Sequence, residues 1–263
     1  LSDDEIWLKV KERAIDRMTS IIVNFIQRVR KLSLSATGLD EKISEYEPVS
    51  EEEEHFLQLA SKVYKAYLHR IETTGEDDFD GLLQKAALLI QEGKTTFERK
   101  SGNGNFTDLK FILIDEYQDF TALFYKLVSA IKQHASNANF FCVGDDWQAI
   151  NGFAGSDLEY FSDFGKYYQP SRKLEITTNY RSLESIVNTG NSLMKGLGTP
   201  ARAFSGNSGS VKLVDMDKFE PSPREQSSFA GDHLTPVVLR LIQKNLAKGH
   251  NVVLLSRKNT LPW

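Results

Sequence analysis

Apolar residues recur every three to four positions through most of the first hundred residues, which is the period of an amphipathic helix. We expect a helix that begins near residue 2 and continues to Val29, a second that begins near residue 50 and ends at Gly75, and a third over Phe79–Gln91. The polar segment Gly38–Pro48 predicts a connection between the first two. Capping-box patterns mark two of the starts, Ser2 with Glu5 and Ser50 with Glu53.

Beyond residue 105 the pattern changes to short apolar runs that alternate with helical segments. Phe111–Ile114 and Asn139–Val143 are runs typical of strands buried on both faces of a parallel sheet, and Ala122–His134 between them has helical spacing. Ser101–Asn105 reads as a flexible loop. Further strands are expected near residues 173–177, 211–214 and 252–255, and further helices from residue 182 and over residues 234–247. A helical first third followed by α/β alternation indicates at least two structural units.

Composition narrows the class of protein. The chain has 32 basic and 36 acidic residues, a net charge of −4, which excludes a strongly basic nucleic-acid-binding domain but leaves room for a local basic groove. No stretch approaches 18 consecutive apolar residues and the first residues are acidic, so neither a membrane span nor a secretion signal is expected. The single cysteine, Cys142, excludes a disulfide scaffold or zinc ribbon and fits the reducing cytoplasm.

Polar clusters follow the two central apolar runs. The first run leads directly into Asp115–Asp119, and the second leads into Gly144–Gln148. Because parallel strands end at the same edge of a sheet, we expect these two clusters to lie side by side. Their carboxylates are the oxygen ligands that Mg²⁺ prefers, together with water and substrate phosphates. A lone Asp-Glu after a strand is more often a cap or surface turn, so the pairing of two clusters carries this prediction.

Three ordered motifs, LIDEYQD, VGDDWQAINGFAGSD and TTNYRS, resemble the middle of the UvrD/Rep-like superfamily 1 DNA helicases, with details closest to the helicase IV branch. The resemblance extends from about Phe25 to the C-terminus. It implies an α/β fold of incomplete RecA-like P-loop NTPase motor domains, a parallel sheet with flanking helices, plus an N-terminal helical subdomain. The implied division is a helical subdomain over residues 1–105, part of the first motor domain over 106–170, and the start of the second over 171–263.

The resemblance implies a site for ATP and Mg²⁺ at the first two motifs. Asp115 matches the Walker B aspartate that holds Mg²⁺ on the phosphates, and Glu116 matches the residue that polarises the attacking water. Gln118 and Asp119 match positions that tie this strand to its neighbours and to the coupling machinery. Asp145, in the second acidic cluster, is a further candidate for the nucleotide site.

The later motif positions imply a sensor, an arginine and a nucleic-acid surface. Gln148 matches the glutamine that senses the γ-phosphate, and Arg181 matches the arginine that reaches that phosphate from the second motor domain. Phe153 can stack on a base, and Asn151, which stands where the family usually has an aromatic residue, is a second candidate for nucleic-acid contact. Trp147 is as well suited to packing as to nucleic-acid contact. The implied partners are single-stranded DNA and duplex junctions, with movement from 3′ to 5′.

The P-loop pattern G-x-x-x-x-G-K-[ST] does not occur in the sequence. Gly93-Lys94-Thr95 imitates its last letters but follows a predicted helix where a strand is required. We therefore expect an internal piece of a larger helicase that does not turn over ATP alone. A catalytically lapsed binding or regulatory module and part of a helicase-nuclease remain alternatives. A stand-alone metal nuclease is the weakest alternative, because the helicase motifs explain the carboxylates, no supporting His or Lys lies nearby in sequence, and the five histidines show no ligand spacing.

Overall fold

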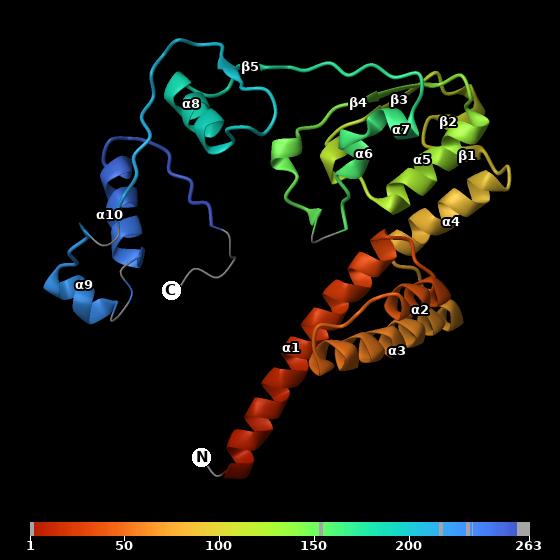
Figure 1. Ribbon diagram of the computed structural model, residues 1–263, viewed down its shortest axis with the longest axis horizontal. Helices are drawn as coiled ribbons and strands as arrows, with labels where there is room; N and C mark the ends of the chain where they lie inside the picture. Colours follow the sequence, from red (N-terminus) through yellow and green to blue (C-terminus); the bar gives the residue numbers. More distant parts are fainter. Residues whose placement is uncertain (1–2, 153–154, 216–217, 230–231, 233, 257–263) are drawn as a thin grey trace. The chain divides into compact units, whose positions relative to one another are not determined.

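A computed structural model shows a mixed helix and sheet protein (Figure 1). The structure describes residues 3–152, 155–215, 218–229, 232 and 234–256. The chain divides into two compact units, Leu1–Lys173 and Leu174–Trp263, and each is considered by itself. Within the described ranges, no helix combines the length and apolarity needed to cross a lipid bilayer.

The first unit begins with four helices, α1 (Asp3–Lys31), α2 (Ala36–Ser44), α3 (Glu51–Thr74) and α4 (Phe79–Gln91). The predicted start and end of α3 are confirmed: Ser50 accepts a hydrogen bond from the backbone of Glu53, and Gly75 ends the helix with a φ of 68°. The core of this region joins α1, α2 and α3. Its buried members are Ile22, Ile26, Val29, Leu39 and Tyr64.

The prediction of a connection over residues 38–48 was wrong, because α2 occupies most of that segment. The side chain of Ser35 caps this helix by accepting from the backbone N–H of Gly38. Leu39 is only 4% exposed and packs into the core with α1 and α3. A nine-residue helix that buries one leucine leaves too weak a periodic signal to be recognised in the sequence.

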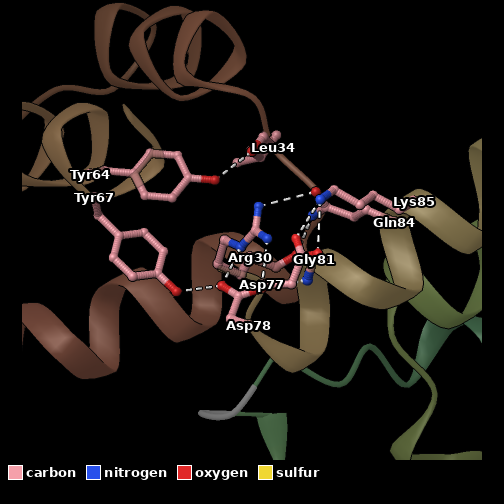
Figure 2. Close-up of polar contacts among 9 residues, drawn as sticks. All are labelled: Arg30, Leu34, Tyr64, Tyr67, Asp77, Asp78, Gly81, Gln84 and Lys85. Carbon is pink, nitrogen blue, oxygen red and sulfur yellow. Dashed lines mark hydrogen bonds and ion pairs between the residues drawn. The ribbon is translucent and has the colours of Figure 1, made fainter. Parts of the chain in front are cut away.

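A buried polar network joins α1 to α4 (Figure 2). Arg30, near the end of α1, donates from Nε and Nη2 to the two carboxylate oxygens of Asp78, at 2.9 and 2.7 Å. Its Nη1 also donates to Gln84 Oε1 at 3.1 Å, and the Tyr67 hydroxyl donates to Asp78 Oδ2 at 2.5 Å. Burial and the bond to Asp78 raise the pKa of Tyr67 to about 12. Burial alone would raise the pKa of Asp78, but the hydrogen bonds from Arg30 and Tyr67 lower it below its usual value.

A short antiparallel hairpin follows α4, formed by β1 (Thr96–Arg99) and β2 (Gly102–Asn105). The prediction of an irregular loop over residues 101–105 was therefore wrong. The ring of Phe97 lies where a side chain on Gly104 would project, so glycine at this position lets the aromatic ring pack across the hairpin. Phe97 also packs against Phe106, with ring centroids 4.7 Å apart.

The predicted strand, helix, strand unit is confirmed as β3 (Phe111–Ile114), α5 (Ala122–His134) and β4 (Asn139–Cys142). The two strands are parallel, and Ile114 pairs with Cys142. Burial on both faces is not observed, since Leu113 is 71% exposed and Phe111 and Phe141 are also exposed. The reason is that the sheet has two strands, and no described element covers that face. Short helices complete the unit: η1 (Phe106–Asp108), η2 (Tyr117–Asp119), η3 (Asp146–Gln148), α6 (Glu159–Ser162) and α7 (Phe164–Tyr167).

The second unit contains β5 (Thr178–Asn179), α8 (Glu184–Leu193), β6 (Arg202–Ala203), α9 (Pro223–Ser228) and α10 (Leu234–Leu246). Here β5 and β6 pair in parallel, and the helices expected from residue 182 and over residues 234–247 are present as α8 and α10. The strands expected at 211–214 and 252–255 are not formed, whereas the strand expected near 173–177 is found directly after that range as β5, where Arg202 N donates to Thr177 O at 2.7 Å. Leu213 is 99% exposed. An apolar run becomes a strand only where a neighbour completes its hydrogen-bond ladder, and the described residues supply none at residues 211–214 and 252–255.

Candidate functional site

The ends of β3 and β4 bring the two acidic clusters to one edge of the sheet, as the strand pattern predicts. The parallel ladder continues past both strands, with Val143 N donating to Ile114 O and Tyr117 N donating to Val143 O, each at 2.9 Å. The clusters that follow therefore start from neighbouring backbone positions. We call the set Asp115, Glu116, Gln118, Asp145 and Gln148 the acidic rim.

Asp115 and Glu116 stand exposed at the tip of β3. Asp115 Oδ1 accepts from the backbone N–H of Glu116 at 2.9 Å. Glu116 has φ 51° and ψ 44°, the left-handed conformation that non-glycine residues rarely adopt. This conformation turns the chain directly into η2, and the Asp119 N–H donates to Glu116 O at 2.9 Å. Strained backbone of this kind is concentrated at functional sites, which supports the choice of this turn as the centre of the site.

Gln118 links the two halves of the acidic rim. Its side chain is buried, with 3% of the residue exposed, and its Nε2 donates to Glu116 Oε2 at 2.6 Å. Its Oε1 accepts from the backbone N–H of Asp145 at 3.0 Å. Gly144 makes this approach possible, because a Cβ there would lie 2.7 Å from Gln118 Oε1 and 2.9 Å from the ring of Phe161. The amide thus holds the Glu116 carboxylate against the end of β4.

Asp145 extends the rim to Gln148 through η3. Its Oδ1 accepts from the backbone N–H of Trp147 at 3.1 Å, and its Oδ2 accepts from Gln148 Nε2 at 2.7 Å. Gln148 is exposed and Trp147 is half-buried. An unbroken series of contacts therefore runs from Asp115 to Gln148, across both strand ends.

Asp119 makes a contact that sequence reasoning missed. Its Oδ2 accepts from Asn151 Nδ2 at 2.9 Å, while its Oδ1 is buried without a hydrogen-bond partner in the described part of the chain. The replacement of the family's usual aromatic residue by Asn151 was the one available signal, because an amide can bond a carboxylate and a ring cannot. Phe153, expected to stack on a base, lies outside the described residues.

Aromatic side chains pack around Tyr117, which directly follows Glu116 of the acidic rim. Tyr117 is almost fully buried and packs against Phe120 and Phe164, with ring centroids 4.5 and 5.7 Å away.

Burial raises the pKa of the Cys142 thiol at the end of β4 to about 11. This cysteine is therefore a packing residue and not a thiolate nucleophile at neutral pH.

Arg181 lies in the second unit, where a turn after β5 presents it to solvent. Asn179 Oδ1 accepts from the backbone N–H groups of Arg181 and Ser182 at 3.0 and 2.8 Å. This side-chain-to-backbone turn fixes the local direction of the chain before α8. The association of Arg181 with the acidic rim stays a prediction from the resemblance.

The rim suits a metal bound together with a phosphate substrate. Within the described residues, no three histidine, cysteine or acidic side chains converge as a metal cage. Mg²⁺ commonly binds through one or two carboxylates and completes its shell with water and substrate phosphates. The exposed carboxylate of Asp115 fits that role. Within the described chain it accepts one hydrogen bond, from the backbone N–H of Glu116 to Oδ1.

Comparisons with known proteins identify the family of the chain. The family model for the UvrD/REP helicase N-terminal domain matches residues 5–169. The chain is 25% identical to DNA helicase IV of Escherichia coli (strain K12) over 179 residues, 66% of this chain and 25% of that protein. It is 28% identical to the ATP-dependent DNA helicase PcrA of Staphylococcus epidermidis over 158 residues, 59% of this chain and 21% of that protein. It is 32% identical to the ATP-dependent DNA helicase Rep of Buchnera aphidicola over 133 residues, 51% of this chain and 18% of that protein.

The chain thus spans a quarter or less of the length of each of these relatives. The matched region contains both strands of the parallel sheet and the whole acidic rim. Because the family model covers more than half of the sequence, the chain belongs to the UvrD/REP helicase N-terminal domain family.

Proposed function

We propose that this chain forms the nucleotide-facing edge of an ATP-dependent DNA helicase or translocase and works as part of a longer protein. The observation that carries the proposal is the bridge by Gln118, which joins Glu116 at the end of β3 to Asp145 at the end of β4. Ligands of parallel α/β sheets bind beyond the carboxyl ends of the strands, which is where this bridge lies. The relatives named ATP-dependent DNA helicases support ATP as the nucleotide.

Asp115 and Glu116 divide the work of hydrolysis in this proposal. Asp115 would hold the Mg²⁺ that accompanies ATP, and such an ion would supply positive charge that neutralises the phosphates. Glu116 Oε2 is occupied by the amide of Gln118, and its other carboxylate oxygen has no hydrogen bond within the described residues. That free oxygen is able to orient the attacking water and to accept its proton.

Gln148 and Arg181 report on the γ-phosphate. Gln148 is exposed and is held by Asp145, so it can exchange this bond for one to a nucleotide. Arg181 contributes a planar cation that stabilises charge on the transferring phosphoryl group. We assign residues 106–170 and 171–263 to parts of two RecA-like lobes and residues 1–105 to a helical subdomain. Trp147 and Phe153 are the proposed aromatic contacts to single-stranded DNA, with movement from 3′ to 5′.

The test uses the protein encoded by the complete reading frame that encloses this chain. We expect Mg²⁺-dependent ATP hydrolysis that single-stranded DNA stimulates and that Glu116→Gln lowers by about 100-fold or more, the usual contribution of a general base. Glu98→Gln is the matched control, because Glu98 is an exposed glutamate on the hairpin strand β1. The 263-residue chain alone, which has no P-loop sequence, should show no turnover.

Two outcomes would contradict the proposal. Binding of single-stranded DNA without any ATP hydrolysis by the enclosing protein would favour the lapsed binding or regulatory module. Strong hydrolysis by the isolated chain, abolished by Glu116→Gln, would show that the P-loop is dispensable and that the proposed division of the site is wrong.

A further inference from the structure

The loop at the end of the second motif, residues 151–157, leaves and rejoins the same short stretch of chain. At its start, Asn151 Nδ2 donates to Asp119 Oδ2 at 2.9 Å. At its end, the backbone N–H of Asp157 donates to Phe120 O at 2.9 Å. Both ends of the loop are therefore bonded to the neighbouring residues Asp119 and Phe120, at the end of η2.

Two further contacts close the base of this loop. Ser156 forms an antiparallel bridge with Thr121. Gly155 is buried with a φ of +96°, and a Cβ on it would lie 3.0 Å from the Cβ of Lys31 in α1. The base of the loop consequently has little freedom to move independently of η2 and α1.

The side-chain contact connects the loop to the proposed base of the reaction. Asp119 closes η2 by donating its backbone N–H to Glu116 O at 2.9 Å, so Asp119 and Glu116 lie at the two ends of one 3₁₀ turn. Within the described residues, Asn151 is the only side chain that bonds the Asp119 carboxylate, whose other oxygen is buried and unpaired. Loss of the Asn151 amide would leave a partly buried carboxylate without any side-chain partner, which favours a maintained contact.

We propose that Asn151 is a positioning residue that holds the loop to the turn bearing Glu116, instead of a contact to the DNA strand. A DNA strand bound at the loop would then change the position of η2 through the hydrogen bond from Asn151 to Asp119. The Glu116 carboxylate would move with η2. This inference rests on the proposed function and refines it. It gives Asn151, at a position where the family usually has an aromatic residue, a role in the response to DNA.

An exchange of the two side chains tests the contact directly. Asn151→Asp places two carboxylates against each other and removes the donor. The double variant Asn151→Asp with Asp119→Asn restores one donor and one acceptor with reversed direction. The readout is the factor by which saturating single-stranded DNA raises the ATP turnover of the enclosing protein. We expect a loss of roughly fivefold in Asn151→Asp, a size typical of residues that carry coupling. The double variant should recover to within about twofold of wild type.

A second measurement separates failure of this inference from failure of the proposed function. Hydrogen exchange of residues 115–119, with and without a single-stranded oligonucleotide, needs no ATP hydrolysis. We expect the oligonucleotide to slow exchange there in wild type and in the double variant, but not in Asn151→Asp. If Asn151→Asp is too unstable to purify, Asn151→Ala and the double variant make the same comparison.

The inference is overturned if the double variant responds to DNA as poorly as Asn151→Asp. It is also overturned if Asn151→Asp only raises the Kd for single-stranded DNA and higher DNA concentrations restore the full stimulation. That result would make Asn151 a contact to the DNA. An absence of ATP hydrolysis in wild type, with normal exchange behaviour, would contradict the proposed function alone.

Discussion

Arg30 and Asp78 form a two-pronged ion pair that fastens the end of α1 to the start of α4 (Figure 2). Arg30 is 5% exposed, and the Asp78 carboxylate also caps α4 by accepting from the backbone N–H of Gly81. One carboxylate thus serves as helix cap, ion-pair partner and acceptor for the Tyr67 hydroxyl. Because α4 packs along α5, this pair sets how the helical region meets the sheet.

Removal of the Arg30 guanidinium should strongly destabilise the first unit. Arg30→Met leaves the Asp78 carboxylate without its main partner, and breaking a buried pair from one side costs about 3 kcal/mol of unfolding free energy. Urea denaturation followed by circular dichroism measures the change. Lys85→Met is the matched control: Lys85 pairs with Asp77 on the surface, and the expected loss is about 0.5 kcal/mol. Equal losses in the two variants would contradict the assignment.

The contribution of this pair should disappear in acid. The pKa of Asp78 is lowered in the folded protein, so its stabilising effect is complete above the unfolded value of about 3.9 and is lost as the pH falls through the lower folded value. The difference in unfolding free energy between wild type and Arg30→Met should therefore be constant from pH 7 to about pH 5 and shrink towards pH 3. Urea titrations at several pH values test this, and a constant difference down to pH 3 would argue against it.

Gln118→Leu should destabilise the protein, although the leucine and glutamine side chains are similar in size. The leucine would leave Glu116 Oε2 and the backbone N–H of Asp145 without the partner that now bonds both. Loss of a buried hydrogen-bonding group of this kind costs roughly 1–3 kcal/mol. Gln58→Leu is the control, since Gln58 is exposed on α3 and, among the described residues, its side chain bonds only Glu54. Thermal denaturation of both variants should show a clear decrease for Gln118→Leu alone.

Gly144→Ala should be destabilising because the new methyl group has no space. Its Cβ would lie 2.7 Å from Gln118 Oε1 and 3.0 Å from the backbone nitrogen of Gln118. Overpacking of this kind costs about 1–3 kcal/mol. Gly152→Ala provides the comparison, because a Cβ at that position meets no atom of the described residues within 4 Å. A Gly144→Ala protein as stable as Gly152→Ala would mean that Gln118 can move away without cost.

Local sequence patterns were sufficient for the long helices and for the central β3, α5, β4 unit. The caps of α3 lie within a few residues of the helix they limit, at Ser50 and Gly75, so they act through contacts that the sequence places side by side. The meeting of the two acidic clusters also followed from sequence order, because parallel strands joined by one helix must end at the same edge.

Contacts between distant residues decided the rest. The apolar runs at 211–214 and 252–255 have the composition of strands, but a strand also needs a neighbour, and the sequence does not show whether one is present. The hydrogen-bond partners within the site could not be predicted from the sequence for the same reason. The bridge from Gln118 to Asp145 spans 27 positions and the bond from Asn151 to Asp119 spans 32. Residue types and spacing located the acidic rim, whereas the partner of each polar atom depends on which side chains the folded chain brings within hydrogen-bonding distance.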